Sequence, residues 1–193
     1  MDFTLIISIV VSGVVTDNIV LSQTLGICPF LGVSKKLDSA LGMGFAVTFV
    51  LAISTVVCYF LYQLLVALGY EYLQTILFIL IIAALVQLLD IVLKKISPSL
   101  YNALGVYLAL ITTNCCVLGT ANNVITNGYD LVTGLIHAIA IGLGFTLALV
   151  LMAGVRSKTE RSDCPKSFKG LPLALITAGI MSMAFAGFAG LSF

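Results

Sequence analysis

The chain has 193 residues, of which 61% are hydrophobic and only 9% are charged, and its mean hydropathy is +1.20. A soluble domain carries about 25% charged residues, and a single core cannot bury so much apolar surface. A soluble enzyme, a disordered chain and a disulfide-rich secreted domain are therefore excluded. The net charge of +1, with no basic arm, also excludes nucleic acid as a plausible partner. The composition predicts a polytopic protein of the lipid bilayer.

Six apolar stretches are long enough to cross the hydrocarbon core as helices, which takes about 20 residues each. They run approximately over Phe3–Leu25, Leu41–Leu68, Leu73–Leu93, Leu100–Leu118, Leu131–Val155 and Leu171–Leu191. Each is too long and too continuously apolar for a strand of a membrane barrel. The sequence therefore predicts an all-α fold of six transmembrane helices in one integral membrane domain, residues 1–193.

The basic residues fall only in alternate loops of this arrangement. The three loops contain Lys35 and Lys36, then Lys94 and Lys95, then Arg156, Lys158, Arg161, Lys166 and Lys169. The opposite side has Asp2, Glu71 and Asp130 and no basic residue. Because cytoplasmic loops carry the excess of Lys and Arg, we expect a bacterial cytoplasmic (inner) membrane protein with both termini outside.

Two short motifs recur along the chain. C-x-x-L-G occurs at Cys28–Gly32 and Cys115–Gly119, and G-x-G-F occurs at Gly42–Phe45 and Gly142–Phe145. Their common order divides the chain into repeats of about 1–95 and 96–193, each with three spans. An odd number of spans makes two such repeats inverted, related by a pseudo-twofold axis in the membrane plane. The glycines of G-x-G-F are expected to allow close helix packing.

Inverted repeats often place their site at broken helices near the midplane. The pair Asp17-Asn18 interrupts the first stretch, so we expect a break there, followed by a short half-helix that ends or turns near Cys28 and Pro29. Thr112–Asn114 predicts a comparable interruption before Cys115. Only such broken geometry brings Cys28 and Cys115 to the same depth.

Two interpretations of these equivalent cysteines stay open on the residues alone. They could be small apolar residues that pack between helices, or thiolate ligands of a metal or an iron–sulfur cluster; a disulfide has less support. A [2Fe–2S] cluster takes four ligands, so a second subunit would have to supply two of them. Cys116 points about 100° away from Cys115 on a helix, Cys58 is expected to pack, and Cys164 is expected to be an exposed thiol.

Three polar side chains are candidates for an ion path: Asp17, Asn18 and Asn114. An ionisable residue inside a span is a functional candidate by default, although Asp17 and Asn18 could equally cap the half-helix that follows. His137, near the outer end of the fifth span, is expected to be a hydrogen-bonded residue of a helix interface.

The segments Leu25–Leu37, Leu110–Cys115 and Ala174–Gly179 resemble the A subunits of Rnf electron-transport complexes. The resemblance covers nearly the whole chain. It is weaker to the homologous E subunit of the sodium-pumping NADH:quinone oxidoreductase, which differs at Pro29, Gly32 and Thr113.

This resemblance implies an integral subunit of an ion-translocating ferredoxin:NAD+ oxidoreductase, coupled to Na+ or H+ movement, with no complete active site of its own. It implies an intramembrane [2Fe–2S] cluster ligated by Cys28 and Cys115 and by two cysteines of a paralogous six-span partner. The further subunits of such a complex are B, C, D and G. The alternatives are a non-redox inverted-repeat transporter and a structural scaffold.

Overall fold

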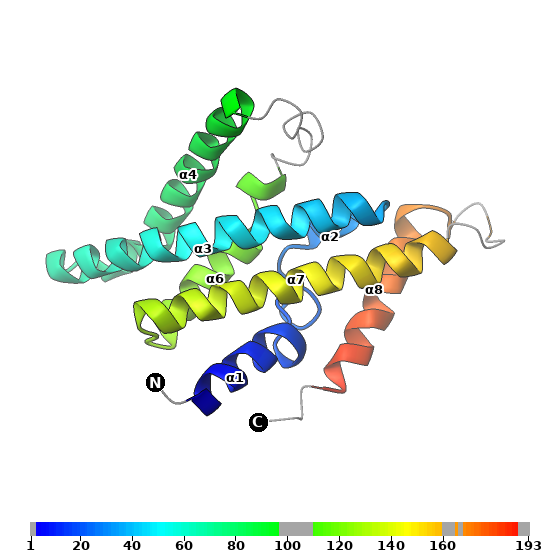
Figure 1. Ribbon diagram of the computed structural model, residues 1–193, viewed down its shortest axis with the longest axis horizontal. Coiled ribbons are helices and arrows are strands. Elements are labelled where there is room, and N and C mark those ends of the chain that lie inside the picture. The colour runs from blue at the N-terminus through cyan, green and yellow to red at the C-terminus, as the bar shows by residue number, and fades with distance from the viewer. Residues whose placement is uncertain (1–2, 97–109, 160–164, 166–167, 189–193) are drawn as a thin grey trace.

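The computed structural model describes residues 3–96, 110–159, 165 and 168–188, and its elements are all helical (Figure 1). The helices are α1 (Phe3–Val11), α2 (Ile27–Val33), α3 (Leu37–Leu68), α4 (Gln74–Ile96), α6 (Cys115–Thr126), α7 (Leu131–Thr159) and α8 (Leu171–Ala186). A π-helical turn, η1 (Ser12–Thr16), continues α1, and a 3-10 turn, η2 (Glu71–Leu73), precedes α4. The predicted all-α class is confirmed.

Three of these helices are long and apolar enough to cross a bilayer: Leu37–Leu68, Gln74–Ile91 within α4, and Leu131–Thr159. Their most apolar windows have mean hydropathies of 2.2 to 2.4. Two shorter apolar helices cover Ile6–Thr16 and Leu171–Ala186. Helices of this length and composition are those of a membrane protein.

The centre of the fold is an antiparallel pair, α3 and α7, which run side by side over most of their length (Figure 1). Gly44 of α3 lies against Thr146 of α7, and Gly142 of α7 lies against Thr48 of α3. Each threonine hydroxyl donates to the carbonyl of the glycine four residues earlier in its own helix, at 2.8 Å. The predicted close packing is confirmed at Gly44 and Gly142, where a Cβ on Gly142 would stand 2.5 Å from Thr48 Oγ1. It is wrong at Gly42, which has nothing within 4 Å of an added Cβ.

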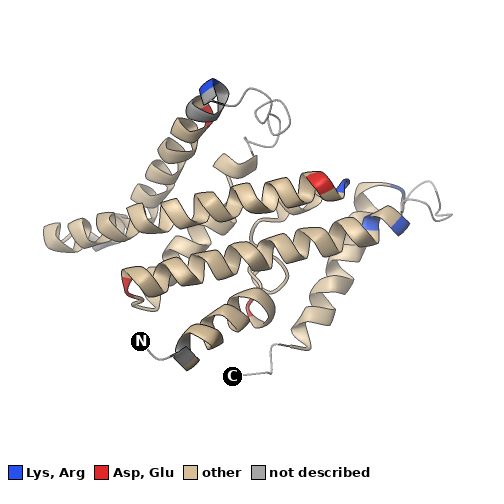
Figure 2. Cartoon of the chain, viewed as in Figure 1, with Lys and Arg blue, Asp and Glu red and all other residues tan. Residues whose placement is uncertain are grey.

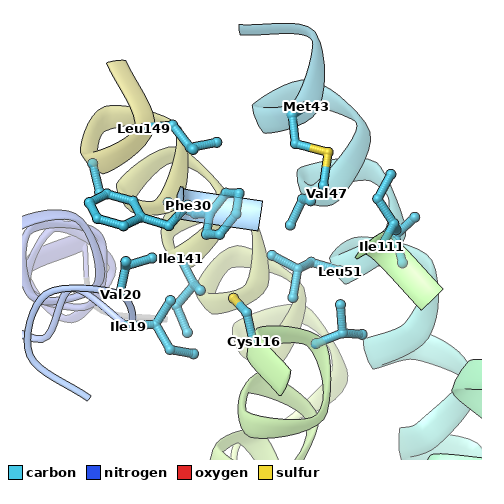
Figure 3. Close-up of a cluster of buried hydrophobic side chains, with 14 of the residues drawn as sticks. Ile19, Val20, Phe30, Met43, Val47, Leu51, Ile111, Cys116, Ile141 and Leu149 are labelled. Carbon is cyan, nitrogen blue, oxygen red and sulfur yellow. The ribbon is translucent and has the colours of Figure 1, made fainter. Parts of the chain in front are cut away.

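The buried core joins these long helices to the short segments around them. Phe30 of α2, Cys116 of α6, Ile141 of α7 and Leu51 of α3 all contribute side chains that are at most 2% exposed. Figure 3 shows these side chains converging with Ile19, which precedes α2. The interrupted segments are therefore held by the same core as the continuous helices.

One helix end differs from the expectation. The fourth stretch was predicted to end at Leu118, but α6 continues to Thr126. Its polar residues are accommodated in the helix, since Thr120 and Thr126 donate their hydroxyls to the carbonyls four residues earlier, Cys116 and Asn122, at 2.8 and 2.9 Å. The first part of that predicted stretch, residues 100–109, lies outside the described residues.

Candidate functional site

The first helix breaks at Asp17, as predicted. The Asp17 N–H donates to Ser12 O at 2.7 Å, closing the π-turn, and the backbone is then non-helical as far as Gly26. Non-helical backbone at membrane depth is tolerated only where protein satisfies its polar groups. Helices with single π-turns frequently mark functional sites.

The Asn18 side chain forms hydrogen bonds with several of the backbone polar groups at this break. Its side chain is fully buried. Its Oδ1 accepts from the N–H groups of Val20 and Leu21 at 3.1 and 3.3 Å, while its Nδ2 donates to Val14 O at 3.1 Å and to Gly144 O at 2.8 Å. Asn18 therefore ties the loop of residues 17–26 to α7.

The short helix after this loop begins at the cysteine motif, so the predicted half-helix ending near Cys28 and Pro29 is wrong. Gly26 adopts a left-handed conformation, with φ of +82°, and α2 starts at Ile27. Pro29 therefore lies in the first turn, where its missing N–H leaves no helical bond unmade. Cys28 is in this same first turn.

The second break lies before Cys115, as the run Thr112–Asn114 predicted. Asn114 is the N-cap of α6, and its Oδ1 accepts from the Cys116 N–H at 3.1 Å. Cys115 is consequently the first residue of a 12-residue helix. The positive end of that helix dipole favours negative charge on the cysteine sulfur.

The two breaks meet in space. The Gly26 N–H donates to Cys115 Sγ at 2.9 Å, across 89 residues of sequence. Gly26 is two residues from Cys28, and consecutive Cα atoms are about 3.8 Å apart, so the backbone at Cys28 starts within about 8 Å of this contact. The structure thus brings together the two segments that carry the repeated cysteine motif.

The cysteines differ sharply in exposure. Cys28 and Cys115 are exposed, whereas Cys58 is 1% and Cys116 is 0% exposed, and all four are free thiols. Cys58 packs in the core as expected, and Cys116 is buried in the same core. Cys164 lies outside the described residues. The described part of the chain holds no cluster of three or more His, Cys, Asp or Glu side chains that could bind a metal alone.

A buried donor stands beside Cys115 without a partner. Asn114 is 4% exposed, and its Nδ2 makes no hydrogen bond in the described structure. An unpaired buried N–H costs about 1–3 kcal/mol, so such a group indicates a missing acceptor. An anionic group held by Cys115 would supply one.

Sequence reasoning missed the role of Arg156, which was expected in the basic loop after Val155. The structure places Arg156 in the last turns of α7 and only 6% exposed. Its guanidinium donates to Leu31 O at 2.8 Å and Ser34 Oγ at 2.9 Å, at the end of α2. A cation there stabilises the negative end of the α2 dipole and so fixes the helix that carries Cys28.

His137 also departs from expectation, since it was predicted to be hydrogen-bonded. Both of its ring nitrogens are buried without a hydrogen-bond partner in the described structure. Its ring instead packs edge-on against Tyr129, with centroids 5.3 Å apart. Nothing in the local sequence pattern distinguishes an unpaired histidine from a paired one.

Comparison with known proteins decides the family. Residues 6–192 match the family model described as "Rnf-Nqr subunit, membrane protein". The chain belongs to the Rnf-Nqr family. The resemblance carried by the cysteine motifs is thereby confirmed.

Members of the Rnf-Nqr family resemble this chain over nearly its full length. It is 54% identical to the A subunit of the "Na(+)-translocating ferredoxin:NAD(+) oxidoreductase complex" of Acetobacterium woodii, covering 96% of this chain and 97% of that one. It is 51% identical to the A subunit of the "Ion-translocating oxidoreductase complex" of Syntrophotalea carbinolica, over 95% of both chains. A protein of the same description from Thioalkalivibrio sulfidiphilus is 49% identical.

Proposed function

We propose that this chain is an integral membrane component of an ion-translocating ferredoxin:NAD+ oxidoreductase complex. Its part is to hold half of an intramembrane [2Fe–2S] cluster through Cys28 and Cys115 and to relay electrons across the membrane. The names of its Acetobacterium and Syntrophotalea relatives support the complex.

One observation carries the proposal for the cluster. The two cysteines that the repeat singles out are the exposed ones of the four described, and the Gly26–Cys115 contact joins their segments. Packing cysteines would be buried, as Cys58 and Cys116 are. Exposed thiols in an apolar protein suit a site that a partner subunit completes.

The surrounding groups fit an anionic iron–sulfur centre. The Gly26 N–H donates to Cys115 Sγ, the Asn114 Nδ2 is free to donate, and the α6 N-terminus contributes positive potential. Hydrogen bonds to the sulfurs are among the factors that set the reduction potential of such a centre. When bound, a [2Fe–2S] cluster accepts and returns one electron. Phe145 and Cys116, both fully buried behind Gly26, would exclude water from its inner side.

The membrane arrangement we propose has six spans as two inverted repeats, with both termini outside the cytoplasmic membrane. The reciprocal Gly44–Thr146 and Thr48–Gly142 contacts support a twofold relation between the halves. Figure 2 shows Lys and Arg where α3 begins, where α7 ends and where α8 begins, with one acidic residue in the first turn of α3 and another at the opposite end of α7. That distribution supports a cytoplasmic location for the basic end.

Two cysteines cannot complete the cluster, so the proposal requires a partner. We assign the remaining two ligands to a paralogous six-span subunit of opposite orientation, docked over Cys28 and Cys115. The B, C, D and G subunits would complete the complex. The coupled Na+ or H+ would pass Asp17, in the loop that Asn18 fixes, and approach the half-site near Asn114.

The test is a set of single cysteine variants in the purified whole complex. Cys28→Ala and Cys115→Ala should each abolish one [2Fe–2S] signal in the difference EPR spectrum and lower the bound iron accordingly. Cys58→Ala and Cys116→Ala are the matched controls, and both should keep signal and iron. Size-exclusion chromatography checks that every variant assembles.

The alternatives predict different outcomes. A non-redox transporter, or a scaffold for the redox subunits, predicts that the signal survives both alanine changes. That result would overturn the proposal. Membership of a quinone-reducing complex predicts that the purified complex reduces quinone and not NAD+.

A further inference from the structure

A polar cavity of about 340 Å³ lies apart from the cysteine site, between η1, the end of α6 and the first half of α7. It is lined by Ser8, Ile9, Ser12, Asp17, Gln23, Asn123, Asn127, Tyr129, His137 and Ile141. Asp17, Gln23 and Asn127 are exposed and form its mouth, whereas Asn123, Tyr129 and His137 are half-buried.

The composition of this lining is unusual for the chain. All but Ile9 and Ile141 carry a polar side chain, and the set includes no Lys or Arg, although 61% of the chain is hydrophobic. Polar groups inside a membrane protein are costly and mark ion or substrate pathways. Most of the polar groups offer oxygen, which is the donor that hard cations prefer.

Within the described part of the chain, His137 gives this cavity two unpaired polar atoms. Both of its ring nitrogens are buried without a hydrogen-bond partner in the described structure, although the ring borders a cavity. The cavity has room for several molecules, because a water takes about 30 Å³ of liquid volume. Water, or a hydrated ion, in the cavity would satisfy the ring.

The charge of the lining selects the ion. Asp17 is its single carboxylate, and Ser12 Oγ donates to Asp17 Oδ2 at 3.1 Å, which orients it. Ca²⁺ and Mg²⁺ sites typically use several carboxylates or phosphates, and zinc takes nitrogen and sulfur ligands. One carboxylate among neutral oxygens balances one positive charge. We propose that this cavity binds a monovalent alkali cation, with Asp17 as the charged ligand and amide and hydroxyl oxygens completing its shell.

The inference deepens the proposed function and rests on it for the role of the ion. The loop of residues 17–26 begins at Asp17, which lines the cavity, and ends at Gly26, whose N–H donates to Cys115 Sγ. Helix α6 likewise has Cys115 at its start and Asn123 near its end. Two segments of the chain, the loop of residues 17–26 and helix α6, therefore connect the cation site to the cysteine site directly.

Cation protection of Asp17 against a carbodiimide tests the site in the unaltered complex. The purified complex is treated with dicyclohexylcarbodiimide at fixed pH in NaCl, LiCl, KCl or choline chloride, and the Asp17 peptide is quantified by mass spectrometry. At a cation concentration ten times the dissociation constant, labelling should fall roughly tenfold, since only the free fraction reacts. Asp130, exposed and outside the cavity, is the internal control. Equal labelling rates in all four salts would overturn the proposal.

A variant pair on α6 and its C-terminal cap tests the neutral ligands. Asn127→Ala should raise the Na+ concentration for half-protection severalfold, whereas Asn122→Ala, five residues earlier and outside the lining, should leave it unchanged. The ligand assignment would be contradicted if both changes raised this concentration equally, or if neither change raised it. The EPR spectra of these preparations separate the two proposals. Absent protection with a cysteine-dependent cluster signal rejects the cation site alone. A signal that survives Cys28→Ala and Cys115→Ala rejects the proposed function alone.

Discussion

The crossing of α3 and α7 and the meeting of the two helix breaks each involve one of the repeated motifs, G-x-G-F and C-x-x-L-G, but they satisfy the backbone in different ways. At the crossing, Thr48 and Thr146 bond within their own continuous helices and fill the space that Gly142 and Gly44 leave. At the breaks, Asn18 and Asn114 replace helical hydrogen bonds.

The two regions also differ in what they leave open. At the crossing, the facing surfaces of α3 and α7 pack against each other through their glycines and threonines. The breaks leave Cys28 and Cys115 exposed and the Asn114 Nδ2 without a partner. The exposed thiols and the unpaired donor thus lie where the backbone leaves the helix, and the continuous helices pack behind them. This division makes different predictions for glycines in the two regions.

The largest effect is expected where α7 meets α1 and η1. A Cβ at Gly144 would stand 2.6 Å from Gly13 O and 3.1 Å from Val14 Cα, which are backbone atoms that cannot rotate away. Gly144→Ala should therefore destabilise the protein by about 1–3 kcal/mol or more, separate α1 from α7, and lower the yield of assembled complex. Size-exclusion chromatography after graded heating measures the loss.

Gly154→Ala is the control for this change. It lies on the same helix with nothing within 4 Å of the added Cβ, and alanine is favoured over glycine in a helix by about 0.8–1.0 kcal/mol. The heating midpoint should hold or rise. Equal losses for both alanines would mean that α7 does not pack here as described.

A smaller and more local effect is expected at the breaks. Gly26→Ala places a side chain in the left-handed region, at about 1–2 kcal/mol, and 3.0 Å from Phe145 and 3.3 Å from Asn114 Oδ1. The start of α2 must then move away from Cys115. The complex should assemble but contain less [2Fe–2S] iron, as iron analysis and EPR would measure.

Gly69→Ala provides a matched change of backbone. Gly69 also has a positive φ, +75°, but nothing lies within 4 Å of the added Cβ. The Gly69→Ala variant has the same conformational cost of a side chain at positive φ, but its added Cβ contacts no other atom of the described structure. The complex with this variant should keep its iron. If both variants lose iron equally, the contact between Gly26 and the Cys115 segment is not what positions the cysteines.

The sequence predicted the features that depend on local chemistry. Asp17 and the run before Cys115 interrupt apolar stretches, and both breaks occur there. The glycines of G-x-G-F predicted a tight crossing, although not its partners, since nothing local pairs Gly44 with Thr146.

The features it missed depend on long-range contacts. Pro29 is compatible with either the end or the start of a helix. The structure shows the start, because Gly26 adopts a left-handed conformation and α2 begins directly after it. Arg156 looks like one basic loop residue among five until α2 is folded against it. The unpaired state of His137 could not be predicted, because the cavity beside its ring is formed by several separate segments of the chain.

Thiol cross-linking tests most directly whether the two breaks form one site. In the complex stripped of iron, with Cys58 and Cys116 changed to Ala and Cys164 to Ser, a short bifunctional maleimide should join Cys28 to Cys115 within one chain. Mass spectrometry of the linked peptides identifies the product. Efficient intrachain linkage is the predicted result. Single-ended labelling of both cysteines without linkage would contradict a shared site.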